Sequence, residues 1–246
     1  MSTITAEVRK AFAGKLWWIF LLAGLGLSAI TIIALIPDHV TAIQAGTGSA
    51  QAALDDATRY WMTLYLAAGC LIAYLTAGEF TDGQMQRSIL LNRLNRTRVA
   101  WTKFAAAIII ATFFGLTAAT LAWTTPTLIT TAYGIDLTGT TIDTQIIVGV
   151  LTVNILAGIW GYGLGLLLRN PVAAVSLFVV QTLFLETYGA RAFPEIGKYL
   201  LTSTMGSLYK DPSPLSIAML PALAIALAWV LTALTAGITT VKTRDV

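Results

Sequence analysis

The sequence predicts an all-α membrane protein that crosses the bilayer six times. Of its 246 residues, 57% are hydrophobic and only 11% are charged, and the mean hydropathy is +0.77. An average soluble domain carries about 25% charged residues, so the chain is too apolar for a soluble globule and far too apolar for disorder. Its apolar residues also gather in charge-free runs that are long enough to cross a bilayer as helices.

Six such runs define the predicted spans. They are too long, and alternate too little, to be barrel strands. The runs cover residues 16–36, 60–77, 104–125, 146–168, 171–185 and 215–241. The fifth run is short, and we expect its helix to continue to about Tyr188, with Glu186 near its outer end. The whole chain, 1–246, is then a single transmembrane domain.

The basic residues predict the orientation of these spans, because Lys and Arg are enriched in cytoplasmic loops. Eleven of the fifteen fall on one side and four on the other. The eleven are Arg9, Lys10, Lys15, Arg87, Arg93, Arg96, Arg98, Lys103, Arg169, Lys242 and Arg244; the four are Arg59, Arg191, Lys198 and Lys210. Both termini should therefore be cytoplasmic, in a bacterial plasma membrane. The net charge of +3 reflects topology and does not indicate a nucleic-acid partner.

Residues 1–15 have the pattern of an amphipathic helix. Ile4, Val8, Ala11 and Phe12 fall at helical spacing, and Gly14 can end the helix before the first span. Such a segment can form an "elbow" helix lying on the inner leaflet. The alternative is a helical extension of the first span.

The cytoplasmic segment 78–103 between spans two and three carries five of the fifteen basic residues. Thr81 or Asp82 can cap a helix that runs to about Leu94. Leu90, Leu91 and Leu94 would form one apolar patch on this helix. It can sink into the inner leaflet or dock on a partner; the alternative is a solvated basic loop that only fixes topology.

Small and polar residues inside the spans indicate how the helices meet. Ala157, Gly161 and Gly165 would let two helices approach closely, either within the chain or at a dimer seam. Five polar residues are candidates for a translocation path, or alternatively for internal packing alone: Thr117, Thr120, Thr124, Asn154 and Gln181. The long external segment 186–214 mixes apolar stretches with Gly and Pro, which favours short re-entrant or interfacial helices.

Several chemistries are missing from the sequence. It has no P-loop motif, so ATP and magnesium would have to bind elsewhere. One cysteine, Cys70, and one histidine, His39, exclude an internal disulfide, a cysteine zinc site and a site with two imidazoles. The spans also lack central charges of the kind that ion-driven carriers use. We expect no catalytic residue, no metal and no cofactor bound by this chain.

Four short motifs resemble the membrane subunit, or permease, of ABC-2 type transporters. They are Gly78-Glu79-Phe80-x-x-Gly83, Arg96-Thr97-Arg98-Val99-x-x-x-Lys103, Leu166-Leu167-Leu168-Arg169-Asn170-Pro171 and the ending Arg244-Asp245-Val246. The order of elbow, six spans, coupling loop and external re-entrant helices is similar as well. The chain departs from the family at Arg93 and Asn95, where a proline and a small hydroxyl residue are common.

The resemblance implies a mechanism and partners. Two permease chains, identical or different, would sit in lipid on two ATPase subunits that hold ATP and magnesium. The coupling segment would transmit motion through Glu79, Arg87, Leu90, Leu91, Arg93, Leu94 and Arg96. The path would lie near spans one, two and five. The family exports lipid-linked glycans, peptides, antibiotics and other hydrophobic compounds, so we expect export of a hydrophobic or amphipathic compound (peptide, antibiotic or lipid-like). The competing hypotheses are a non-transporting scaffold or sensor that recruits cytoplasmic partners, and an intramembrane enzyme.

The charge asymmetry generates a topology prediction. In a chain whose Cys70 has been replaced, a cysteine at position 49 should react with an impermeant thiol reagent applied outside intact cells. A cysteine at position 88 should react only after the membrane is opened. The opposite labelling pattern would invert the predicted orientation.

Overall fold

The computed structural model describes residues 3–85, 87 and 96–243, and within this part of the chain it contains helices and no strands. Six helical segments are long and apolar enough to cross a membrane, as expected for a multi-pass membrane protein. In chain order the elements are α1 (Thr3–Ala13), α2 (Leu16–Gln44), α3 (Ala50–Arg59), the 3-10 helix η1 (Tyr60–Thr63), α4 (Leu64–Thr81), α6 (Arg96–Thr124), α7 (Pro126–Ala132), α8 (Thr144–Leu168), α9 (Pro171–Val180), the π-helix η2 (Gln181–Leu185), α10 (Glu186–Ala192), α11 (Pro194–Gly197), α12 (Leu201–Leu208) and α13 (Met219–Thr243).

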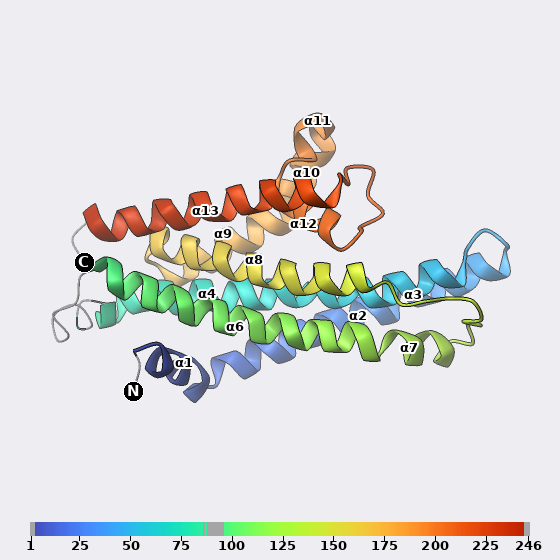
Figure 1. Cartoon of the computed structure of the whole chain (residues 1–246), viewed down its shortest axis with the longest axis horizontal. Helices are drawn as coiled ribbons and strands as arrows, with labels where there is room; N and C mark the ends of the chain where they lie inside the picture. The colour runs from blue at the N-terminus through green and yellow to red at the C-terminus, as the bar shows by residue number, and fades with distance from the viewer. Residues whose placement is uncertain (1–2, 86, 88–95, 244–246) are drawn as a thin grey trace.

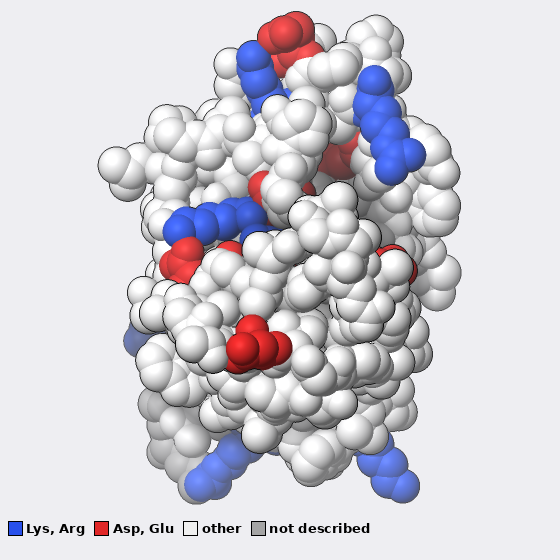
Figure 2. Space-filling view, turned by 90° about the vertical axis from the view of Figure 1, so that its right-hand side faces the viewer, with Lys and Arg blue, Asp and Glu red and all other residues white. Residues whose placement is uncertain are grey.

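The long helices run roughly along one axis, and the connections between them gather at two ends (Figure 1). One end of the bundle, which we call the terminal end, holds the first and last described residues of the chain. It also holds α1 and the C-terminus of α4. The opposite end holds α3 and α7, and α10–α12 lie on the side of the bundle, beside the start of α13. Figure 2 looks onto this opposite end, where isolated charged side chains are scattered over a mostly uncharged surface.

Helices α4 and α8 form the centre of the bundle. In an apolar 18-residue stretch of each span, 72% and 67% of the residues are buried, against 39% or less in the other four spans. Glycine makes this closeness possible: a Cβ atom on Gly161 would lie 2.3 Å from the carbonyl oxygen of Gly69, and one on Gly165 would lie 2.7 Å from Cβ of Thr76. Ala157 on the same helix is also buried. The small residues of α8 are therefore occupied within the chain and leave this face closed to a second copy.

Several predicted boundaries were wrong. The second span was expected to begin at residue 60, but helix extends from Ala50 because Ser49 caps α3: its Oγ accepts a hydrogen bond from Ala52 N at 3.1 Å. The sixth helix begins at Met219 and not at 215. The residues just before Met219 are not helical. In this stretch Ile217 N donates to Ser207 Oγ at 3.1 Å and not to a helical carbonyl.

Three other helices outrun their apolar stretches. The first span continues past Pro37 to Gln44, and the third begins at Arg96, well before residue 104. The fifth helical segment reaches Ala192, which agrees with the expected extension past Leu185. Hydropathy located these helices but not their ends, because the added turns are polar or amphipathic.

Helix α1 is separate from α2 and packs against α6. The chain bends at Gly14 and Lys15, and Trp17 Nε1 donates to the carbonyl of Phe12 at 2.8 Å across the bend. The rings of Phe12 and Phe113 meet edge to face with their centroids 5.4 Å apart. Helix α1 is therefore not a continuation of the first span.

The Gly161 contact generates a stability prediction. Gly161→Ala should lower the melting temperature of the purified protein in detergent, because the new methyl group would collide with the backbone of α4 at a cost of about 1–3 kcal/mol. Gly26→Ala is the matched control. It adds the same methyl group in a helix where nothing lies within 4 Å, so its melting temperature should not fall. Equal melting temperatures for the two variants would contradict the close approach of α4 and α8.

Candidate functional site

An ion-pair cluster lies at the terminal end of the bundle, around Lys103. The ammonium group of Lys103 contacts Glu7 Oε1 at 2.9 Å, Glu79 Oε1 at 2.8 Å and Glu79 Oε2 at 2.7 Å. Lys10 Nζ lies 2.8 Å from the same Glu79 Oε1. The Lys103 side chain is only 6% exposed, so its charge is stabilised by these carboxylates and not by water.

The sequence positions of these residues determine what the cluster connects. Glu79 lies in the last turn of α4 and Lys103 in the second turn of α6, so the pair joins the two stems of the segment between these helices. Glu7 and Lys10 are one turn apart on α1, and both face this pair. The cluster therefore ties α1 to both stems of the segment that the sequence predicts to be a coupling loop.

A second contact at the same end involves the turn between α8 and α9. Arg169 has a left-handed backbone conformation with φ of 54°, and its Nη2 donates to the carbonyl of Thr240 at 2.8 Å. Its guanidinium carbon lies 4.8 Å from the centroid of the Phe80 ring. Asn170 caps α9 by accepting a hydrogen bond from Ala173 N. The turn thus contacts the ends of both α4 and α13.

The predicted coupling residues are placed only in part. Glu79 is in the cluster, with a side chain 12% exposed, so it faces its own chain. Arg87 is exposed, and Arg96 is the first residue of α6. The remaining members, Leu90, Leu91, Arg93 and Leu94, lie outside the described residues, as do Asn95 and the last three residues of the chain.

The three threonines proposed for a translocation path lie toward the outside of the bundle. Each hydroxyl donates to the carbonyl four residues earlier on α6, at 2.8–2.9 Å. Thr120 and Thr124 are exposed and Thr117 is half-buried. Their hydroxyl donors are satisfied within their own helix, as is usual for threonine in a membrane helix.

Asn154 and Gln181 occupy two further, separate environments. Asn154 is fully buried beside Gly115 of α6, and its Nδ2 donates to the carbonyl of Val150 at 2.8 Å. Gln181 begins the π-helix and donates to Glu186 Oε1 at 2.7 Å. The five polar residues of the predicted path are therefore not brought together in one cavity.

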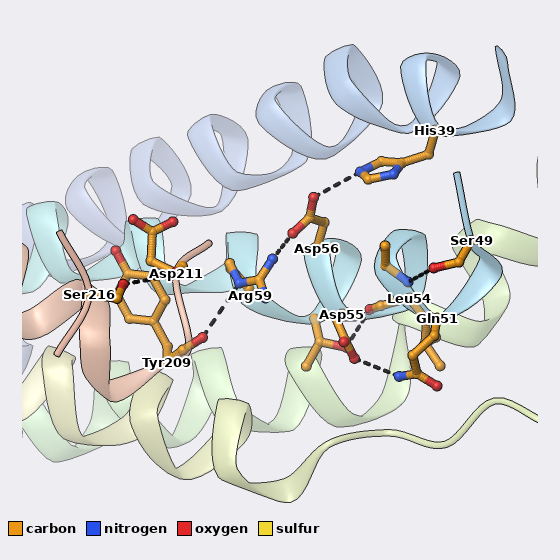
Figure 3. A network of polar contacts seen from close by, with 12 residues as sticks. His39, Ser49, Gln51, Leu54, Asp55, Asp56, Arg59, Tyr209, Asp211 and Ser216 are labelled. Carbon is orange, nitrogen blue, oxygen red and sulfur yellow. Dashed lines mark hydrogen bonds and ion pairs between the residues drawn. The ribbon is translucent and has the colours of Figure 1, made fainter. Parts of the chain in front are cut away.

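A polar network at the opposite end was not predicted (Figure 3). Asp56 lies between His39 of α2 and Arg59 of its own helix: His39 Nε2 is 2.8 Å from Asp56 Oδ2, and Arg59 pairs with Asp56 Oδ1. Arg59 Nε also points to the carbonyl of Tyr209, at 3.5 Å. The network joins α2, α3 and the loop after α12. A signal in the sequence could have indicated it: Ser49 is a helix-capping residue, and an amphipathic stretch follows it. Together they predict that the second span extends outward to include Asp56 and Arg59.

Glu186 has a structural role in the external segment. Its Oε2 accepts a hydrogen bond from Thr202 N at 2.5 Å, in the first turn of α12, while its Oε1 accepts from Gln181. Leu200, at the N-cap of α12, provides no side-chain acceptor, so Glu186 performs that function from a different helix. Nearby, partial burial raises the pKa of the Asp211 carboxyl, and Arg59 opposes this shift.

Among residues 3–85, 87 and 96–243, no three His, Cys, Asp or Glu side chains converge in a way that could hold a metal ion. Cys70 is buried in α4. Comparison with known proteins adds no identity, since no family model and no curated protein matches the chain.

The Lys103 cluster generates a prediction about α1. Lys103→Met should destabilise the protein by about 3 kcal/mol, because it removes the buried cation that Glu7 and Glu79 share and leaves only the more exposed Lys10 beside Glu79. Helix α1 should also become more readily cleaved by trypsin at Arg9 and Lys10. The control is Lys198→Met, which removes an exposed ion pair with Glu195 and should change neither property. Unchanged stability and cleavage in Lys103→Met would show that the cluster does not hold α1.

Proposed function

We propose that this protein is the membrane subunit of an ABC-2 type transporter, which exports a hydrophobic or amphipathic compound from a bacterial cell. ATP and magnesium would bind to two separate ATPase subunits, and a second permease chain, identical or different, would complete the membrane domain. The observation that carries the proposal is the Lys103–Glu79 pair, which joins both stems of segment 82–95 to each other and to α1.

The orientation of the proposed transporter follows from charge. In this proposal the terminal end is cytoplasmic, because eleven of the fifteen basic residues belong to segments at that end. Helix α1 would lie at the inner leaflet as the elbow. The short helices α10–α12 would lie on the outside as the re-entrant or interfacial part of segment 186–214. The ATPases would then meet the end that carries the ion-pair cluster.

The cluster gives the proposal a route for mechanical coupling. ATP-driven closure of the ATPases would move the segment between α4 and α6. Because Glu79 and Lys103 hold the two stems together, this motion would pass to both helices and, through Glu7 and Lys10, to α1. Helix α4 packs against α8 at the centre, so a displacement of its end reaches the core of the bundle.

The surfaces left open by the chain are compatible with a second permease and with lipid. In the apolar 18-residue stretches of α2 and of the fifth span, only 28% and 22% of the residues are buried within the chain. Their exposed residues are largely apolar, including Leu22 and Ile30 on α2 and Phe184 in the π-helix. A path between two permeases near spans one, two and five would be lined by such faces.

The competing proposal is a scaffold or sensor that recruits cytoplasmic partners without transport. The same ion-pair cluster could then fix a docking platform at the terminal end. The two proposals differ in the partner: a transporter requires an ATP-hydrolysing chain that copurifies with it, whereas a scaffold does not.

The test is a charge placed on the predicted apolar patch of the coupling segment. Leu94→Asp should leave the amount of protein in the membrane normal but abolish copurification of the ATPase and export of the compound. Loss of an apolar anchor at the centre of an interface commonly costs about 2 kcal/mol or more, and the carboxylate would add a desolvation penalty.

The control is Arg93→Ala, which removes a charge expected at the rim and should have a milder effect. If Leu94→Asp retained both the ATPase and full transport, segment 82–95 would not be the coupling element. If the wild-type chain copurified only with partners that do not hydrolyse ATP, the scaffold would be the better proposal.

A further inference from the structure

A cavity of about 330 Å³ lies beside the ion-pair cluster, between α1, the start of α2, α4 and α6. It exists because α2 leaves α4 toward the terminal end and turns back into α1 (Figure 1). Nearer the opposite end the same helices touch, since a Cβ atom on Gly24 of α2 would lie 2.9 Å from Cβ of Ala67. The cavity is therefore a wedge that opens toward the end bearing both termini.

The lining of the wedge is divided into an apolar and a charged part. Ile72 and Leu75 of α4, with Ala106, Ala107 and Ile110 of α6, supply an apolar wall from within the spans. The charged part comes from the ends of the helices and from α1. A ligand that matches this division has a hydrophobic body and one polar or charged group.

The charges in the lining favour a positive group on that ligand. Three carboxylates, Glu7, Glu79 and Asp82, face two ammonium groups, Lys10 and Lys103. Lys103 donates to Glu7 Oε1 and Glu79 Oε1 and lies 2.7 Å from Glu79 Oε2, so its charge is already opposed by two carboxylates. The Oε2 atom of Glu79 is buried and accepts no hydrogen bond from the residues that the structure describes. Asp82 is exposed and forms no ion pair with any residue that the structure describes. Among the lining residues that the structure describes, one negative charge is thus left over.

Two tyrosines complete the lining, and one of them supports the same conclusion. Tyr74 and Tyr162 both line the cavity. The hydroxyl of Tyr162 is already used, because it donates to the carbonyl of Ala100 at 2.6 Å. Tyr162 is only 1% exposed and serves as a wall, whereas Tyr74 is 38% exposed and is the ring that a cation can reach.

We infer that this wedge binds a hydrophobic organic cation, with its apolar body against α4 and α6 and its charge near Asp82 and Glu79. The role of this site as the place where an exported compound first binds rests on the proposed function. Binding of the cation itself can be measured without any ATPase. The inference narrows the substrate class to cations and places the site within one chain, apart from any path between two permeases.

The experiment compares two probe ions of nearly the same shape and opposite charge. Binding of radiolabelled tetraphenylphosphonium and of tetraphenylborate is measured by equilibrium dialysis with the full chain in phosphatidylcholine nanodiscs, after subtraction of protein-free nanodiscs. Tetraphenylphosphonium should bind saturably. Tetraphenylborate should bind at least about tenfold more weakly, because the one surplus negative charge of the lining would repel it.

Three variants locate the binding. Ala107→Trp should weaken phosphonium binding about tenfold or more by filling the wedge. Asp82→Asn, at an exposed turn where folding is not at risk, should weaken it about threefold to tenfold by removing the surplus charge. Ala228→Trp is the control, since Ala228 is exposed on α13, away from the cavity, and its binding should match the wild type.

The outcomes separate the two proposals. Equal binding of both probe ions, or unchanged phosphonium binding in both Ala107→Trp and Asp82→Asn, would overturn the cavity inference. Copurification of an ATPase with the same preparation would still support the permease. Saturable phosphonium binding that both variants weaken, without any ATPase partner, would support the site and count against the transporter.

Discussion

The close approach of α4 and α8 is the constraint on which the rest of the structure depends. In lipid there is no hydrophobic force that drives two apolar helices together, so their association relies on packing. Here the backbone of α4 lies where a side chain of α8 would otherwise be, with Gly161 against Gly69 and Gly165 against Thr76. The other long helices pack around this pair and keep wide faces open, to lipid or to a partner.

Because α4 is central, the polar groups at its two ends are linked by one helical segment. Residues 50–81 run through α3, η1 and α4, with Asp56 and Arg59 near one end and Glu79 near the other. One end holds α2 and the loop after α12, and the other holds α1 and α6. This helical segment, with polar contacts at both ends, physically connects the two sides of the bundle.

The sequence predicted the six spans because hydropathy reports directly on helices that must cross an apolar layer. It did not predict where they end, since the extra turns of α3 and α6 are amphipathic or charged. It also singled out Glu79 but did not predict that Glu79 pairs with Lys103. Lys103 lies 24 residues away, and Glu7, its other carboxylate partner, is on a helix before the first span. Such contacts depend on how helices cross, and periodicity along one helix carries no information about that. The wedge could not be predicted from the sequence for the same reason, because its lining comes from several separate segments.

The burial of Lys103 bears on what the cluster contributes. Removing two carboxylates and an ammonium group from water is costly, and apolar residues of the same size often stabilise a fold equally well. We infer that the cluster serves specificity more than net stability. An apolar contact would hold α1 against many neighbouring positions, whereas Lys103 is satisfied only when Glu7 and Glu79 are both within reach. The position of α1 is thereby made conditional on the position of both loop stems. A helix that must follow a moving loop, as the proposed transporter requires, needs this conditional attachment and would gain little from a stronger apolar one.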